Sequence, residues 1–272
     1  MKKVHSSYER RRPGSTPGRN LFAGLARVSA AGLVRYNCAV LFRMASDPGT
    51  PGWPNEDYAC VGPGAAVLLD GATTFPPGTD TGCRHGVAWY ARTLGTDLLA
   101  AISGEPRLPL ASALAAAIAQ VRDRHSGTCD LSARATPAAT VTAVRAEAGG
   151  IGYLALSDSS IAADFGHGRP PQVITDRHRA AAADPDAARH AAVGTLSRAD
   201  LRGVALLSDG ATRITDLYQV LTWPDVIDVI RDQGPAALIS QVRVAEDGDS
   251  ACARWPRDKT KDDATIVYWQ HR

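Results

Sequence analysis

Acidic side chains follow three apolar segments of the sequence, each at the point where the segment ends. The runs are 66–69 before Asp70, 154–157 before Asp158 and 204–208 before Asp209. We interpret each run as a buried strand that delivers an acid to the edge of a sheet. A single Asp-Gly is more typical of a hairpin turn. Three acids at buried strand ends are costly unless they are paired or bind a cation, and together they indicate a metal centre.

Two further acidic pairs extend this set. Glu56 and Asp57 stand where a Pro/Gly-rich loop enters a strand that would pair with the Asp70 strand as a hairpin, and Asp262 and Asp263 stand at the entry to the last strand. Carboxylate oxygens suit Mg²⁺ or Mn²⁺ rather than zinc or copper. Several acids share a small volume only if cations offset their repulsion. Two cations about 3.5–4 Å apart form the usual clamp for displacement at phosphorus.

Cysteine and histidine residues give no competing pattern. The five cysteines contain no Cys-x-x-Cys pair, so we interpret them as reduced thiols rather than a zinc site or a disulfide framework. Five histidines lack paired ligand spacing and are interpreted as surface or loop residues: His85, His125, His167, His178 and His190. No Gly-x-Ser-x-Gly is present, which argues against a serine hydrolase with a nucleophile elbow.

The elements that must position these acids alternate between groups of strands and pairs of helices. Helices are predicted over 80–102, 108–125, 223–233 and 235–246, and strands over 37–44, 136–145, 151–157, 161–165, 172–175, 203–208 and 261–269. The stretch 177–200 has low β propensity and is predicted to be a mobile helical excursion. Antiparallel-looking runs of strands with helix pairs between them predict an α+β fold.

Length and charge limit the other possibilities. The 272 residues divide into a flexible basic arm over 1–34 and a single domain over 35–272. The net charge of +2 gives no general attraction for nucleic acid, so we expect no nucleic-acid partner. No apolar run approaches about 18 residues, which predicts that no segment spans a membrane. The start lacks the pattern of a secretory signal, and we expect a cytoplasmic monomer.

The order of these acids resembles that of the protein phosphatase 2C family of metal-dependent serine/threonine phosphatases. The resemblance covers the chain from about residue 36 to its end. Six short motifs carry it: Asn55-Glu56-Asp57, Val67-Leu68-Leu69-Asp70-Gly71, Thr136-Pro137-Ala138-Ala139-Thr140, Ser157-Asp158-Ser159, Leu207-Ser208-Asp209-Gly210 and Asp262-Asp263-Ala264-Thr265-Ile266-Val267. Each motif is weak alone, and the six in this order are specific together.

The resemblance implies a four-layer sandwich of two antiparallel sheets flanked by helix pairs, with two Mn²⁺ or Mg²⁺ ions in a cleft at one end. Asp70 would bridge both metals and the Gly71 carbonyl would bind one, so that Asp70 and Asp209 are the expected catalytic acids. Asp209 and Asp262 would hold the first metal and Glu56 or Asp57 the second. Asp158 would bind a weaker third ion. A metal-bridging hydroxide would then attack the phosphorus of phosphoserine or phosphothreonine in a phosphorylated protein.

Three departures from the family pattern leave a second interpretation open. Gly52 stands where the family has its phosphate-binding arginine, Ala72-Thr73 follows Asp70-Gly71 in place of His-Gly, and Ser160 replaces an arginine. Arg43 and Arg84 are the candidates to replace the missing phosphate ligand. The alternative is a catalytically weak or inactive phosphatase-like binding module, against which the complete acidic set argues.

Overall fold

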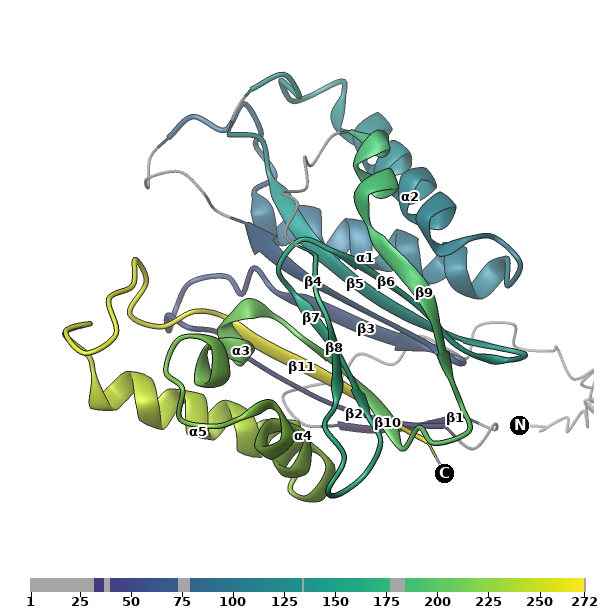
Figure 1. Cartoon of the computed structure of the whole chain (residues 1–272). Coiled ribbons are helices and arrows are strands. Elements are labelled where there is room, and N and C mark those ends of the chain that lie inside the picture. Colours follow the sequence, from purple (N-terminus) through teal and green to yellow (C-terminus); the bar gives the residue numbers. More distant parts are fainter. Residues whose placement is uncertain (1–31, 37–39, 73–78, 134, 177–183, 272) are drawn as a thin grey trace, which may run out of the picture.

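Two antiparallel sheets packed face to face form the centre of the computed structural model, which describes residues 32–36, 40–72, 79–133, 135–176 and 184–271 (Figure 1). One sheet has the order β1-β2-β11-β10-β7-β8, with strands Gly32–Tyr36, Val40–Asp47, Ala264–His271, Gly203–Leu207, Ser160–Asp164 and Gln172–Ile174. The other has the order β3-β4-β5-β6-β9, with strands Tyr58–Gly62, Ala65–Ala72, Ala138–Glu147, Gly150–Leu156 and Ala192–Ser197.

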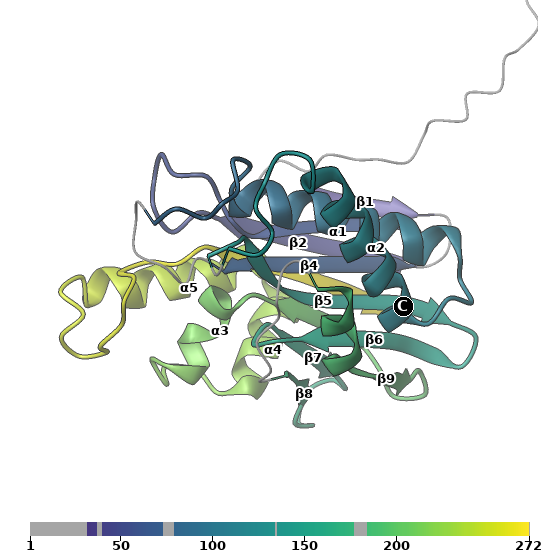
Figure 2. The same cartoon turned by 90° about the horizontal axis from the view of Figure 1, so that it is seen from above.

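Helix pairs cover the two outer faces of these sheets (Figures 1 and 2). The first pair is α1 (Val87–Gly104) and α2 (Leu110–His125), which pack on the five-stranded sheet. The second is α4 (Trp223–Asp232) and α5 (Pro235–Gly248), which pack on the six-stranded sheet together with the short α3 (Asp209–Asp216). A 3-10 helix, η1 (Pro185–His190), precedes β9. The predicted α+β sandwich of four layers is therefore confirmed.

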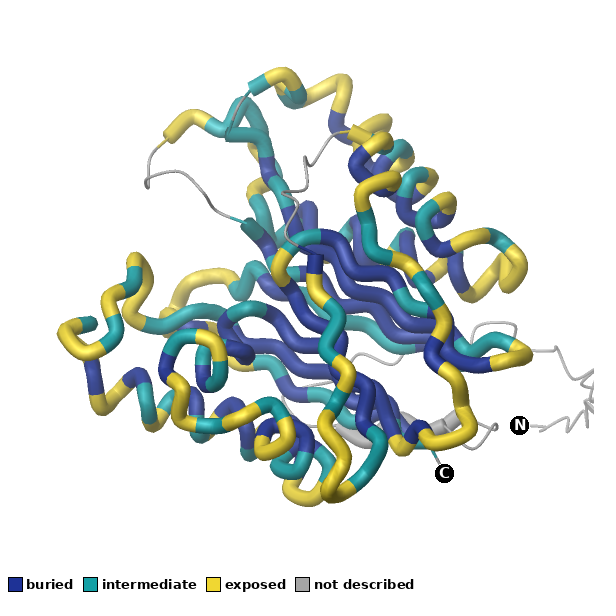
Figure 3. Tube along the Cα trace, viewed as in Figure 1, coloured by how far each residue is buried: buried dark blue, intermediate teal, exposed yellow. Residues whose placement is uncertain are grey.

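Successive side chains of the central strands point to opposite faces, so each sheet packs against the other sheet on one face and against helices on the other. In β4, Leu68 packs between the two sheets while Leu69 packs against α1 and α2. In β10, Leu206 packs between the sheets and Leu207 against the second helix pair. Strands buried on both faces are apolar throughout, and Figure 3 shows them as the continuous buried centre of the molecule.

Some sequence predictions need correction. The boundary at residue 34/35 falls inside β1, which begins at Gly32 and pairs with β2; residues 1–31 of the predicted arm lie outside the described residues. The described part of 177–200 holds η1 and β9 rather than a longer helix. The edge strand β9 forms because it pairs with β6, and this tertiary pairing outweighs its low β propensity. In the pair, Gly194 lies against the Tyr153 ring.

Two helix predictions also change. The sequence did not predict α3, which begins at Asp209, and α1 begins at Val87 rather than at residue 80. Within the described ranges, no helix has the length and apolar character needed to cross a membrane.

Leu68 tests the packing between the sheets. Its side chain is fully buried there, so Leu68→Ala should lower the free energy of unfolding by about 2–5 kcal/mol through lost burial and a residual cavity. Val244→Ala is the control because Val244 on α5 is 72% exposed. Urea denaturation measures both variants, and equal effects would contradict this account of the core.

Candidate metal centre

The ends of strands from both sheets meet at one end of the sandwich. Tyr58 pairs with Leu69 in the β3–β4 hairpin, so that Asp57 precedes β3 opposite the position of Asp70. In the other sheet, β10 ends at Leu207, two residues before Asp209. The Asp209 amide donates to Asp70 Oδ2 over 3.3 Å, which joins the two sheets at this edge.

Asp57 is a buried carboxylate whose oxygens have no hydrogen-bond partner of ordinary geometry among the described residues. Loss of water raises the pKa of Asp57 to about 7, and the negative charges of Asp263 and Asp209 add to the rise. The nearby hydroxyl groups of Ser208 and Thr265 offset only part of it.

Asp70 and Asp209 experience the same repulsion. Desolvation raises the pKa of Asp70 well above its ordinary value, and the carboxylates of Asp57, Asp209 and Asp262 raise it further. Desolvation is also the main cause of the raised pKa of Asp209, followed by the charge of Asp262. Buried carboxylates whose pKa is raised by burial and by neighbouring negative charges form a site that favours a bound cation.

Asp262 brings two basic side chains to this edge. Lys259 Nζ lies 2.9 Å from Asp262 Oδ1, and Arg213 of α3 forms an ion pair with Asp262 Oδ2. Arg213 is also held by the Lys259 carbonyl and lies 3.8 Å from Glu246 Oε1, whereas Lys259 is exposed. Neither cation was predicted from the sequence, although Lys259 stands only three residues before Asp262.

Two glycines allow the backbone to approach closely at the site. A Cβ atom on Gly71 would lie 2.7 Å from the Glu56 carbonyl oxygen and 2.5 Å from Val87 Cγ1 at the start of α1. A Cβ atom on Gly210 would lie 2.0 Å from the Asp263 carbonyl oxygen. Both glycines of the Asp-Gly pairs are therefore required by contacts across the site.

Asp263 positions the loop before β3. Its two carboxylate oxygens accept hydrogen bonds from the Gly49 amide at 2.8 Å and from the Glu56 amide at 2.7 Å. A Cβ atom on Gly49 would lie 2.5 Å from the Asp262 backbone. The hydrogen bond from the Glu56 amide to Asp263 holds Glu56, which is partly buried, beside Gly71.

Asp158 lies at the turn where the chain passes from β6 in one sheet to β7 in the other. Its side chain is exposed, and its charge contributes to the raised pKa of Asp209. The preceding residue, Ser157, has φ of 71°, in the left-handed region that favours glycine. The residue immediately before Asp158 is thus a serine in a strained backbone conformation.

Arg43 and Arg84, the candidates for the missing phosphate ligand, lie on β2 and in the segment before α1. Arg43 pairs with Tyr268, four residues beyond the Ala264 end of β11, or about 13 Å along the strand. Its guanidinium donates to the Arg231 carbonyl and lies over the Tyr268 ring, so the structure does not bring Arg43 to the carboxylates. Arg84 is exposed in the segment before α1. Gly52 is exposed with φ of 84°, so an arginine at that position would be strained.

The donor set fits divalent cations that prefer oxygen ligands. The acids gather at one edge, the buried oxygens of Asp57 have no partner among the described residues, and Gly71 allows the Glu56 backbone to approach the Asp70 strand closely. Mg²⁺ and Mn²⁺ both match carboxylate and carbonyl oxygens. No role in this arrangement requires a cysteine or a histidine.

The structure corrects the interpretation of His125 as a surface or loop residue, because His125 is buried at the end of α2. His125 is buried, with only 3% exposure, and lies with Cys83, His85 and Cys129 in a single group between α1 and α2. The pattern that could have indicated it is Cys83-x-His85 with His125-x₃-Cys129, two pairs brought together only by the helix packing.

Comparison with known proteins agrees with the fold. The family model of protein phosphatase 2C matches residues 50–239, most of the chain. This chain belongs to the protein phosphatase 2C family. A search of the curated proteins finds no match to the sequence.

Solved structures of low sequence identity share the fold. The PPM Ser-Thr phosphatase MsPP from Mycobacterium smegmatis, in complex with cacodylate, has a TM-score of 0.58 at 17% identity, covering 85% of this chain and 98% of its own. PppA of Pseudomonas aeruginosa has a TM-score of 0.60 at 18% identity, covering 89% and 100%. The catalytic domain of PstP in complex with two manganese ions has a TM-score of 0.59 at 15% identity, covering 85% and 97%.

Asp57→Asn tests the cost of burying the Asp57 carboxylate beside other negative charges in the absence of bound metal. Between its ordinary pKa near 4 and its folded value of about 7, Asp57 keeps a proton that the unfolded chain has lost, so wild-type stability falls as the pH rises through this window. The variant lacks this contribution. We expect the melting temperature of Asp57→Asn to fall by several degrees less than that of the wild type between pH 5 and pH 8. Both proteins are measured after dialysis has removed Mn²⁺ and Mg²⁺, and about 1 kcal/mol corresponds to 2–4 °C. Parallel curves for the two proteins would contradict the assignment.

Proposed function

We propose that this chain is a metal-dependent phosphomonoesterase that removes phosphate from phosphoserine or phosphothreonine in proteins. The observation that carries the proposal is the set of carboxylates at one edge of the sandwich: burial raises the pKa of Asp57, Asp70 and Asp209, and the negative charges of neighbouring acids raise each of them further. Membership of the protein phosphatase 2C family supports the reaction type. The solved structure of PstP with two manganese ions supports the choice of cation.

The acidic residues divide between holding cations and shaping the backbone around them. We assign Asp70, Asp209 and Asp262 to one ion, and Asp70, the Gly71 carbonyl and Glu56 or Asp57 to the other. Asp158, which is exposed, would bind a third and weaker ion. When bound, such ions lower the pKa of water and offset charge at the phosphoryl group. Asp263 keeps the Glu56 backbone in place through its hydrogen bond to the amide.

Lys259 is the cation that we propose attracts the phosphate of the substrate. Its ammonium group is exposed, contacts Asp262 and experiences the charges of Glu56 and Asp70. Once metal ions neutralise these acids, the ammonium group is free to turn toward a phosphoryl oxygen. Arg213 is less suited to this role because it is largely buried and held by Asp262 and the Lys259 carbonyl. Arg84 remains a second candidate.

Asp209→Asn tests the proposed metal dependence. The carboxamide keeps the shape but removes the charge, so Mn²⁺-stimulated hydrolysis of a phosphothreonine peptide should fall by at least about 100-fold, beyond the 10–100-fold typical of residues that only orient a ligand. Asp216→Asn, at the other end of α3, is the matched control and should keep its activity. Circular dichroism checks the fold of both variants. Full activity of Asp209→Asn, or wild-type activity independent of Mn²⁺ and Mg²⁺, would refute the proposal.

Lys259→Ala tests the phosphate contact. The variant should raise KM for the peptide about fivefold with little change in kcat, since exposed charge pairs contribute up to about 1 kcal/mol. Lys261→Ala is the control, because Lys261 Nζ lies 2.6 Å from Asp247 Oδ1 and has a different partner. Arg84→Ala is measured beside them. An unchanged KM in Lys259→Ala with a raised KM in Arg84→Ala would transfer the role to Arg84.

A further inference from the structure

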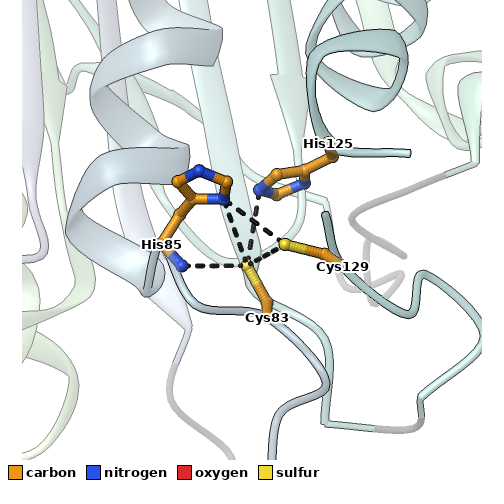
Figure 4. Close-up of side chains that lie close together, drawn as sticks. All are labelled: Cys83, His85, His125 and Cys129. Carbon is orange, nitrogen blue, oxygen red and sulfur yellow. Dashed lines mark hydrogen bonds between the residues drawn. The ribbon is translucent and has the colours of Figure 1, made fainter. Parts of the chain in front are cut away.

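Two cysteines and two histidines from separate segments meet beside the first helix pair (Figure 4). Cys83 and His85 precede α1, His125 is the last residue of α2, and Cys129 follows four residues later. Among the described residues, this is the group of His, Cys, Asp or Glu side chains whose ligand atoms all lie within 4.8 Å of one another.

We propose that Cys83, His85, His125 and Cys129 bind one Zn²⁺ ion, which joins the start of α1 to the end of α2. Two thiolates and two imidazoles are a standard tetrahedral zinc set, and such soft donors disfavour Mg²⁺ and Mn²⁺. The site differs from the proposed catalytic centre in its ligands and in its place in the fold. It also does not depend on the proposed function, because zinc content can be measured without any assay of hydrolysis.

The distances within the group match the edges of a zinc tetrahedron. Cys83 Sγ lies 3.5 Å from Cys129 Sγ and 3.4 Å from His125 Nε2, and His85 Nδ1 lies 3.4 Å from Cys129 Sγ and 3.9 Å from Cys83 Sγ. Bonds of about 2.3 Å to sulfur and 2.0–2.1 Å to nitrogen give tetrahedral edges of about 3.8 Å between sulfurs and about 3.6 Å between sulfur and nitrogen. The sulfur separation is much longer than the ~2.0 Å bond of a disulfide.

Neighbouring groups hold the imidazole rings in this arrangement. Trp89 of α1 stacks on both rings, with centroid distances of 4.3 Å to His85 and 4.7 Å to His125. The His85 amide donates to Cys83 Sγ at 3.4 Å, as expected for a backbone group beside a thiolate ligand. Four protein ligands close the coordination sphere, which is typical of a structural rather than a catalytic zinc site.

Backbone contacts join the two segments around the ligands. The Asp130 amide donates to the Gly82 carbonyl over 2.8 Å and joins the segment after α2 to the segment before α1, while the Cys129 amide donates to the His125 carbonyl over 3.1 Å and forms the turn that carries both ligands. Gly82 has φ of 64°, and a Cβ atom there would lie 2.7 Å from Ala133 Cβ. The segments are therefore shaped to approach each other at the ligands.

The proposed ion would also support the catalytic edge indirectly. Val87, two residues after His85, is the first residue of α1 and packs against Gly71. Zinc binding displaces the two thiol protons to solvent and stabilises the folded chain, because the four ligands are assembled only when α1 and α2 pack. We expect zinc loss to lower stability first, and any effect on hydrolysis to follow from movement of α1.

The test is the metal content of the full-length protein purified under reducing conditions without chelator. Elemental analysis should find one zinc per chain in the wild type and in Cys252→Ser, whose thiol lies after α5. Cys83→Ser and Cys129→Ser should lose most of the zinc, and their melting temperatures should fall by several degrees relative to Cys252→Ser.

A second measurement needs no variant and covers the case in which the serine variants fail to fold. Wild-type protein loaded with Co²⁺ should show the intense visible bands of a tetrahedral site and a thiolate-to-cobalt charge-transfer band. Alkylation followed by mass spectrometry should show Cys83 and Cys129 protected until a chelator is added. A weak octahedral cobalt spectrum, a wild-type protein without zinc, or a Cys83–Cys129 disulfide would overturn the proposal.

Discussion

Repulsion between carboxylates that have lost water is the constraint on which this end of the molecule depends. Asp57 has both oxygens buried without a hydrogen-bond partner among the described residues, and its pKa rises to about 7. Such a group is unfavourable in a folded protein unless something offsets its charge. Lys259 and Arg213 contact Asp262 rather than Asp57. A divalent cation is the simplest means of compensation, because it interacts with several carboxylates at once.

The rest of the sandwich holds these acids in place against that repulsion. Each sheet is buried on both faces, so the strands that end in Asp70 and Asp209 are anchored by packing against the other sheet and against helices. Gly71 and Gly210 then allow contacts that a side chain would prevent. The free energy gained by packing the apolar layers thus offsets the cost of bringing the carboxylates together without a bound cation, and such local costs are common at functional sites.

The sequence predicts those features that follow from burial along a single segment. Apolar runs with terminal acids predict the strands, the β3–β4 hairpin and the place of Asp70, because a strand buried on both faces must be apolar throughout. Features that depend on distant partners were missed: β9 is defined by its pairing with β6, and His125 meets Cys83 only when α1 and α2 pack. Local propensity carries no information on such contacts.

Anomalous diffraction from crystals soaked in Mn²⁺ tests the central claim most directly, because it locates the cations without reference to activity. The account predicts two manganese peaks, about 3.5–4 Å apart, with the Asp70 carboxylate between them and Asp209 and Asp57 or Glu56 on either side. The absence of any peak among these carboxylates, or a manganese ion bound only at the exposed Asp158, would contradict it.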